Sequence, residues 1–246
     1  MKIALIGYGK MGKAIEQVLL KKNEQAGKTI HQITHKITSA NIRQLTPENL
    51  SQADVAIEFS APAFAVENIS KCFDAHVPVV VGTTGWLDDL DKVTVICKQG
   101  NHSLFWAPNF SIGVNLFFEV NKHLAKLMDV HPQYDVTLEE IHHTSKLDAP
   151  SGTAIHLANQ VLKNLSRKSE WVNQATQNDA ELSIISKREP NVPGTHTVSY
   201  QSPIDSIEIK HTAHSREGFA EGAVLAAEWL IGKQGVFTMK DMLGLG

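Results

Sequence analysis

The first 108 residues alternate short apolar runs with stretches of helical spacing. The apolar runs predict buried strands at residues 3–6, 55–59, 77–81 and 93–96. Between them, apolar residues recur every three or four positions over 11–20 and 64–73, which predicts helices. Near-continuous apolar strands that alternate with helices indicate a parallel sheet covered by helices.

Beyond residue 108 the pattern changes to longer helices and alternating strands. Apolar spacing predicts helices over 114–128 and 153–165, and an alanine-rich helix over 219–230. Alternation of apolar and polar residues predicts strands over 136–140 and 206–210. We therefore expect the second half to form a mixed sheet with helices on one face.

Composition narrows the class of protein. The apolar fraction of 42% suffices for a core, and no apolar run is long enough to span a membrane. The net charge of -3 gives no electrostatic case for binding nucleic acid. Cys72 and Cys97 are far apart in sequence, so we expect reduced thiols in a cytoplasmic protein. The sequence shows no signal-peptide pattern before its first apolar run.

A glycine-rich motif of the form G-x-G-x-x-G directly follows the first predicted strand and opens the first predicted helix. In this motif the first glycine allows a tight turn, the second lets the backbone approach a pyrophosphate, and the third permits close helix packing. The alternative is a glycine-rich turn without a ligand, which this position between strand and helix disfavours. The motif predicts cofactor contacts at Gly7, Gly9, Lys10, Met11 and Gly12.

The residues after this motif bear on the choice of cofactor. Folds selective for NAD usually place an acid about 20 residues further on, but residues 25–47 contain neither Asp nor Glu. A second strand is predicted over 29–34, so His35 and Lys36 fall at its carboxyl end, where cations accept a 2′-phosphate. We therefore expect a preference for NADPH over NADH; ordinary solvated cations are the alternative.

Two further predicted strands end in small or hydroxyl-bearing residues, at 58–62 and 82–85. Ligands of open α/β sheets bind at the carboxyl ends of the strands, where such residues leave room for a nicotinamide ring. Tight turns without a ligand are the alternative. The composition changes at 105–111, which predicts a junction between domains. The expected cofactor contacts in these three segments are Phe59, Gly82, Thr83, Thr84, Ala107, Asn109 and Phe110.

The run at 139–154 concentrates groups that carry protons and bind anions. Ser151, Gly152 and Thr153 open a predicted helix, whose free N–H groups and two hydroxyls can bind an anion; a plain N-cap is the common alternative. Two histidines and a lysine precede this helix. An imidazole of ordinary pKa, about 6.5, donates a proton at neutral pH, and a lysine offers a point charge to a carboxylate.

The two adjacent histidines, His142 and His143, are expected to have different roles, because successive residues of a strand face opposite sides. We expect no metal, since the spacing H-H-x-x-K lacks further Cys or His ligands and Lys146 is not a usual zinc ligand. Nearer the C-terminus, Arg216 either reaches the same cleft and the cofactor or forms an ion pair at the domain junction.

Together these segments resemble the 4-hydroxy-tetrahydrodipicolinate reductase (dihydrodipicolinate reductase) family of lysine and diaminopimelate biosynthesis. The run H-H-x-x-K-x-D-A-P-S-G-T-A is the most specific part of the resemblance. The sequence departs from many members at Thr144 and Ser145, where they carry bulkier basic residues. The similar segments follow one another over nearly the whole chain, at 7–12, 58–62, 82–85, 107–115, 140–154, 194–198, 214–223 and 235–245.

The resemblance implies an α/β fold, with an N-terminal Rossmann-type dinucleotide-binding domain and an α+β substrate and oligomerisation domain with a mixed sheet. The domains would be residues 1–109 plus 217–246 and residues 110–216, in a homotetramer. The reaction would pass a hydride from NAD(P)H to a cyclic dicarboxylate, with His142 as proton donor and Lys146 as second catalytic residue. The substrate carboxylates would be held by His143, Ser151, Gly152 and Thr153.

Two other classes of protein fit parts of the sequence. Another two-domain dehydrogenase, such as an aspartate or homoserine dehydrogenase, would share the glycine motif but not the H-H-x-x-K…S-G-T arrangement. A redox-sensing regulator that binds NAD(P) would need no proton donor beside an anion site. The sequence therefore favours a reductase of a small molecule, with neither nucleic acid nor membrane as a partner.

Overall fold

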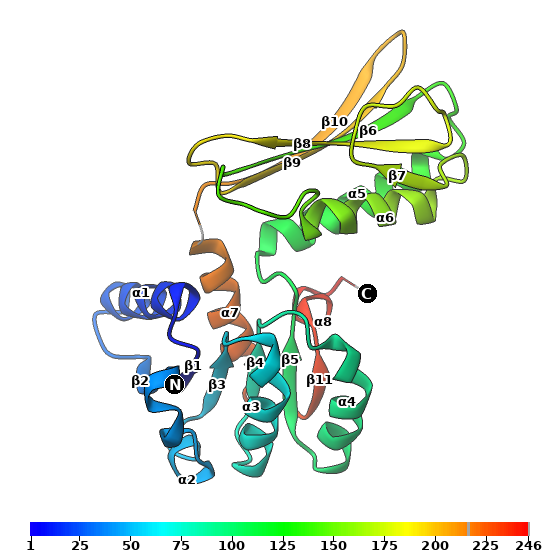
Figure 1. Cartoon of the computed structure of the whole chain (residues 1–246). Helices are drawn as coiled ribbons and strands as arrows, with labels where there is room; N and C mark the ends of the chain where they lie inside the picture. The colour runs from blue at the N-terminus through cyan, green and yellow to red at the C-terminus, as the bar shows by residue number, and fades with distance from the viewer. Residues whose placement is uncertain (216, 246) are drawn as a thin grey trace. The chain divides into compact units, whose positions relative to one another are not determined.

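The computed structural model describes residues 1–215 and 217–245. These residues form two compact units, Met1–Ile112 with Glu217–Gly246, and Gly113–Arg216 (Figure 1). The first unit therefore contains both the N-terminal and the C-terminal segments of the chain, and the second unit lies between them in sequence. Arg216, one of the predicted cofactor contacts, lies outside the described residues. No helix of the described chain is both long and apolar enough to cross a membrane.

The first unit is built on a six-stranded parallel sheet in the order β11-β5-β4-β3-β1-β2 (Figure 1). Its strands are β1 (Lys2–Ile6), β2 (Gln32–Ile37), β3 (Val55–Glu58), β4 (Val79–Val81), β5 (Ser103–Trp106) and β11 (Gly235–Phe237). The last of these comes from the end of the chain and pairs with β5. The predicted parallel α/β sheet is confirmed.

Helices cover both faces of this sheet. Because side chains alternate along a strand, Ile3 and Leu5 face a core with α1 and α7, whereas Ala4 and Ile6 face another core with α3 and α4. Burial on both faces explains the near-continuous apolar runs of the strands. The helices are α1 (Lys10–Gln25), α2 (Pro47–Leu50), α3 (Pro62–Asp74), α4 (Leu90–Gln99), α7 (Glu217–Leu230) and α8 (Met239–Leu243), with short turns η1 (Ser39–Gln44) and η2 (Leu87–Asp89).

The predicted strand at 93–96 is wrong, because these residues belong to α4. Val93 and Cys97 are buried one helical turn apart, while Val95 between them is 52% exposed. That spacing is helical, although β-branched residues such as those of this run are typical of strands. The strand that does lie next to β4 is β5, which begins at Ser103.

The second strand lies three residues further along than predicted, at Gln32–Ile37. The side chain of Asn23 bonds to the backbone of Ile30 and His31 and holds these residues outside the sheet. Pairing with β1 starts only at Gln32. The side chains expected at the carboxyl end of this strand therefore lie within it.

The second unit is a five-stranded mixed sheet in the order β10-β9-β6-β8-β7, with two helices on one face (Figure 1). Strand β9 runs antiparallel to β6 and β10, whereas β8 runs parallel to β6 and β7. This arrangement confirms the predicted mixed sheet. The elements are α5 (Ile112–Met128), β6 (Asp135–His142), α6 (Gly152–Asn164), β7 (Glu170–Val172), β8 (Glu181–Arg188), β9 (Gly194–Gln201) and β10 (Ser206–Ala213).

The two faces of this mixed sheet differ in character. Val136 and Leu138 on β6 face a core shared with Leu157 and Val161 of α6. The opposite face is polar and lines a depression of about 640 Å³ that includes Glu139. Strand β6 therefore buries every second side chain, and residues 138, 140 and 142 share the buried side.

Candidate active site

The predicted dinucleotide motif forms the connection from β1 to α1. Gly7 has a φ of +90°, and a Cβ there would lie 2.1 Å from the carbonyl oxygen of Phe59, so only glycine fits. A Cβ at Gly12 would lie 2.7 Å from the carbonyl oxygen of Gly7, which shows how closely α1 packs on this turn. At Gly9, by contrast, a Cβ would meet nothing within 4 Å. The main chain at Gly9 is thus open to a ligand.

A cavity of about 620 Å³ lies beside this turn. Gly9 is the N-cap of α1 and provides no side-chain cap, so the N–H groups of Lys10 and Met11 lie at an uncapped helix N-terminus. An uncapped N-terminus beside an uncharged cavity suits a pyrophosphate and an adjoining nucleoside. The residues that line the cavity are Ile6, Gly7, Tyr8, Gly9, Ile37, Thr38, Ser39, Ile42, Phe59, Ser60, Ala61, Phe64 and Asn68.

The cations predicted to recognise a 2′-phosphate, His35 and Lys36, lie inside β2, which ends at Ile37. Lys36 Nζ is 2.5 Å from Glu16 Oε1 and 4.9 Å from the centre of the Tyr8 ring. Hydrogen bonds from Lys36 and Tyr8 lower the pKa of the Glu16 carboxyl. Lys36 therefore has a partner within the protein, and its contact with a 2′-phosphate stays a prediction.

The loops after β4 and β5 hold the other predicted cofactor contacts. A Cβ at Gly82 would lie 2.1 Å from the Phe59 ring, so this glycine makes room for the ring. The Oγ1 of Thr83 is buried and has no hydrogen-bond partner among the described residues, and such a group is open to a ligand. Thr84 is exposed. After β5, the Phe110 side chain is 2% exposed and belongs to the core.

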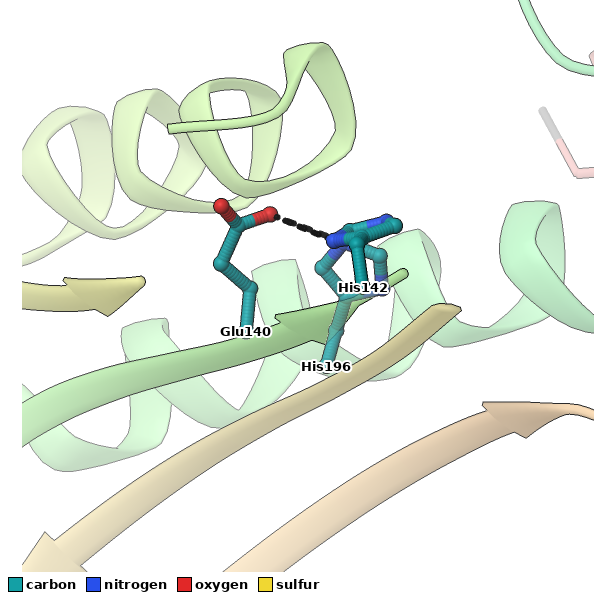
Figure 2. A group of neighbouring side chains, drawn as sticks. All are labelled: Glu140, His142 and His196. Carbon is teal, nitrogen blue, oxygen red and sulfur yellow. Dashed lines mark ion pairs between the residues drawn. The ribbon is translucent and has the colours of Figure 1, made fainter. Parts of the chain in front are cut away.

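The predicted catalytic segment begins at the end of β6. Glu140 and His142 are two residues apart on this strand and therefore face the same side. His196 on β9 pairs in register with Glu140. Figure 2 shows the three side chains gathered together, and all three are buried, with 0%, 7% and 5% of their surfaces exposed.

Glu140 lies at the centre of this cluster. Its Oε2 is 3.0 Å from Nδ1 of His142 and 3.9 Å from Nε2 of His196. Its Oε1 accepts hydrogen bonds from the Ser151 N–H at 3.2 Å and from the Arg188 guanidinium at 3.2 and 3.3 Å. Burial by itself would raise the pKa of Glu140, but the contacts with His142 and Ser151 outweigh burial and hold the pKa well below its usual range.

The two histidines of the cluster differ in their surroundings. Burial lowers the pKa of His196 to about 3, and the nearby His142 adds to this effect. His196 Nε2 lies 3.1 Å from Ser151 Oγ, so a hydroxyl rather than a carboxylate is its nearest partner. The two rings meet edge to face with their centres 5.0 Å apart. His196 is therefore neutral at pH 7, and Glu140 lies closest to His142.

The predicted anion site is the N-terminus of α6. Ser151 is the N-cap, and its Oγ accepts a hydrogen bond from the Ala154 N–H at 3.2 Å. Its own N–H group is bound to Glu140. Gly152 and Thr153 form the first turn, where N–H groups have no acceptor within the helix. Of the three predicted residues, these two have N–H groups placed to bind an anion.

The connection from β6 to α6 carries the other two predicted residues. Lys146 Nζ lies 2.8 Å from both carboxylate oxygens of Asp148, and this hydrogen bond lowers the pKa of Asp148. His143 Nδ1 is 2.9 Å from Ser145 Oγ. The second unit thus places His142, Lys146 and the start of α6 along one short stretch of chain.

Sequence analysis did not predict roles for Glu140, Arg188 or His196. The alternation of β6 was a signal for Glu140, because it faces the same side as His142. Arg188 and His196 come from β8 and β9, which no spacing linked to this segment. Glu140, His142 and His196 each offer a ligand atom within 4.8 Å of the others, as a metal ion requires. The guanidinium of Arg188 on the same carboxylate opposes a further cation there.

The fold and these two sites define a class of protein, a two-domain oxidoreductase that uses a pyridine nucleotide. Family models narrow the class. The model described as dihydrodipicolinate reductase, N-terminus, matches residues 1–110, and that described as dihydrodipicolinate reductase, C-terminus, matches residues 113–243. The chain belongs to the dihydrodipicolinate reductase family.

Curated relatives agree with this assignment. The chain is 49% identical to a 4-hydroxy-tetrahydrodipicolinate reductase of Christiangramia forsetii over 243 residues, which cover 99% of this chain and 98% of the relative. It is 34% identical to a protein of the same name from Neisseria gonorrhoeae, over 80% of this chain and 74% of the relative. The similarity therefore extends over both units.

Solved structures show the same fold. A dipicolinate-bound dihydrodipicolinate reductase from Paenisporosarcina sp. TG-14 superposes with a TM-score of 0.74 at 22% identity, covering 98% of each chain. An aspartate dehydrogenase from Thermotoga maritima gives a TM-score of 0.50 at 14% identity, covering 95% of this chain and 97% of that one. The fold is thus shared with a rival class, and the family models separate the two.

Proposed function

We propose that this chain catalyses the NAD(P)H-dependent reduction of 4-hydroxy-tetrahydrodipicolinate to tetrahydrodipicolinate, a step of lysine and diaminopimelate biosynthesis. One observation carries this conclusion, namely 49% identity over 99% of the chain with a protein of that name. The reaction consumes NAD(P)H and a proton and releases water. Its substrate is a cyclic dicarboxylate, so the site must bind two negative charges and deliver one proton.

The first unit holds the cofactor. The open main chain at Gly9 and the uncapped N–H groups of Lys10 and Met11 would bind the pyrophosphate. When bound, NAD(P)H supplies the hydride. The unpartnered hydroxyl of Thr83 is a candidate for the nicotinamide carboxamide. The remaining proposed contacts lie at the ends of β3, β4 and β5, namely Phe59, Gly82, Thr84, Ala107, Asn109 and Phe110.

The second unit supplies the proton and the positively charged groups that bind the substrate. His142, set against the ionised Glu140, is the proton donor. Lys146 and the N–H groups of Gly152 and Thr153 bind the carboxylates of the substrate. When the substrate binds, Lys146 leaves the carboxylate of Asp148 and pairs with a carboxylate of the substrate. His143 and the Ser151 hydroxyl complete the proposed substrate contacts.

NADPH is the preferred cofactor. Every residue that lines the cavity beside the glycine turn is uncharged, so no carboxylate there repels a 2′-phosphate. Thr38 and Ser39, which follow β2, line the cavity with hydroxyls. Lys36, one residue before the end of β2, supplies a cation.

The enzyme forms a homotetramer through the mixed sheet of the second unit. The polar face of that sheet, opposite α5 and α6, lines a depression of about 640 Å³ with side chains from four strands, β6, β8, β9 and β10. Light scattering on the purified protein checks this. We expect a mass of four times the 27.0 kDa chain, and a monomer would contradict the proposal.

A single assay tests the activity. The substrate is made freshly from aspartate semialdehyde and pyruvate, and the oxidation of NADPH is followed with and without pyridine-2,6-dicarboxylate. We expect oxidation that requires the substrate and that the dicarboxylate inhibits competitively. Oxaloacetate with ammonium, the pair that an aspartate dehydrogenase would reduce, serves as the control. Oxidation with this pair alone would assign the chain to the rival class.

A further inference from the structure

We infer that Glu140 is a positioning residue for the proton donor, holding His142 with Nδ1 toward its carboxylate and Nε2 toward the space beside Gly194. The inference rests on the proposed function for the role of His142 as donor. The ring orientation itself rests on contacts within the second unit (Figure 2). Glu140 touches no reacting atom in this scheme and acts only through the imidazole.

The two nitrogens of the His142 ring have different surroundings. Nδ1 lies 3.0 Å from Glu140 Oε2, within ion-pair distance. An ionised carboxylate offers only hydrogen-bond acceptors, so this contact favours a hydrogen on Nδ1. The proton that the ring gives up would then leave from Nε2.

Gly194 leaves space beside Nε2 of the His142 ring. A Cβ at residue 194 would lie 3.0 Å from His142 Nε2 and 3.3 Å from Cδ2. Gly194 does not have a positive φ, so its backbone does not demand glycine. What glycine provides here is room beside the nitrogen that releases the proton. The start of β9 thus shapes the site without contributing a side chain at that position.

The two oxygens of the Glu140 carboxylate have different partners. Glu140 is buried, and Arg188 and the Ser151 N–H bind its Oε1, so Oε2 remains directed at the histidines. His196, the other ring nearby, is neutral because burial lowers its pKa to about 3. Because Arg188 binds Oε1 and His196 lies 3.9 Å away, His142 at 3.0 Å is the nearest ring partner of Oε2. The carboxylate–imidazole pair resembles the dyads by which other enzymes fix a histidine tautomer.

Glu140→Gln removes the charge while keeping the size of the side chain. We expect kcat to fall by about 10²-fold, with little change in KM for the substrate or in Kd for NADPH. Glu140→Asp keeps the charge and should restore part of kcat. An unchanged kcat in Glu140→Gln would overturn the inference.

Glu170→Gln is the control for the chemical change. Residue 170 is exposed on β7, the edge strand of the same sheet, and belongs neither to the Glu140 cluster nor to the residues that line the depression of the polar face. The same change there should leave kcat as in the wild type. An equal loss in both variants would indicate damage to the sheet rather than to the proton donor, and would also overturn the inference.

A second variant and a spectrum remain decisive if Glu140→Gln does not fold. Gly194→Ala should lower kcat with little change in the Kd for NADPH, because the added Cβ displaces the His142 ring. NMR of ¹⁵N-labelled histidine at alkaline pH, with His142→Gln for assignment, reads the tautomer directly. We expect hydrogen on Nδ1 of His142. Hydrogen on Nε2 would overturn the inference.

The spectrum also separates this inference from the proposed function. A chain that fails to reduce the substrate but shows the Nδ1–H tautomer would refute the proposed function and keep the positioning of the ring. An active enzyme with the opposite tautomer would keep the function and refute the positioning. The two failures are therefore distinguishable.

Discussion

The proposed sites of the two units are built from different parts of the chain. In the first unit the proposed site is main chain, shaped by glycines at positions 7, 9 and 12 and by the uncapped start of α1. In the second unit it is made of buried side chains from neighbouring strands, centred on Glu140. The first site depends on the absence of side chains at its glycines, whereas the second depends on buried charges that must each have a partner.

This difference determines how each site fails. A side chain added at Gly7 or Gly12 would clash with the fold itself, so cofactor binding and stability should decline together there. A buried charge network is different, because an isosteric substitution can remove one charge and leave the shape in place. Substitutions in the second unit should therefore separate catalysis from binding, and most substitutions in the first unit should not.

The largest effect is expected at the proton donor. His142→Gln should lower kcat by about 10²–10⁴-fold, which is the usual contribution of a general acid, while the Kd for NADPH stays near that of the wild type. Lys146→Ala should also reduce turnover far more than NADPH binding, because it removes a positive charge from the substrate site. Stopped-flow kinetics and fluorescence titration with NADPH measure the two quantities. Turnover near that of the wild type in both variants would refute their assignment.

The next effect contrasts two glycines of one turn. Gly7→Ala should destabilise the protein by about 2–5 kcal/mol and abolish cofactor binding, because φ is +90° and the new Cβ would lie 2.1 Å from the Phe59 carbonyl oxygen. Gly9→Ala should leave the free energy of unfolding unchanged, since its Cβ meets nothing within 4 Å. It should still weaken NADPH binding by blocking the approach of the pyrophosphate. Wild-type affinity in Gly9→Ala would contradict the main-chain site.

The contrast between the units also governed what the sequence could predict of the fold. Strands buried on both faces give apolar runs, and β1, β3 and β4 were found in this way. The same rule mistook residues 93–96 for a strand, because all four residues are β-branched although α4 buries only Val93 of them. Strand β9 was missed because one of its faces is polar, and its apolar positions reduce to alternate residues such as Val198 and Tyr200.

The two proposed sites differ in the same way. The proposed cofactor turn could be read from the sequence because its residues are contiguous and the spacing of its glycines matches a known motif. In the second unit, contiguous residues such as His142 and Lys146 were equally visible. Arg188 and His196 were not, because strand pairing brings them to Glu140 from β8 and β9. Pairing partners distant in sequence leave no periodic signal in a single chain.

A smaller effect, on stability, tests whether the cluster holds a neutral histidine. The unfolded chain protonates a histidine near pH 6.5, but folded His196 stays neutral down to about pH 3. The unfolded state therefore binds more protons between these values, and stability falls as the pH is lowered. Between about pH 7.5 and about pH 5.5, urea unfolding should show that the wild type loses about 1 kcal/mol more than His196→Gln. The exposed His123 gives the control variant, His123→Gln, which should lose as much as the wild type.

The smallest effect concerns cofactor choice in the first unit, where the proposed contact is a side chain and not main chain. Lys36→Ala should weaken the binding free energy of NADPH by at most about 1 kcal/mol, because Lys36 is exposed and already paired with Glu16. The Kd for NADH should not change. Lys28→Ala, in the exposed loop before β2, should change neither value. Kinetic constants of the wild type with both cofactors set the reference. Strong selectivity for NADH would refute the preference, and the source of that selectivity would lie outside the glycine turn, which would contact only what the two cofactors share.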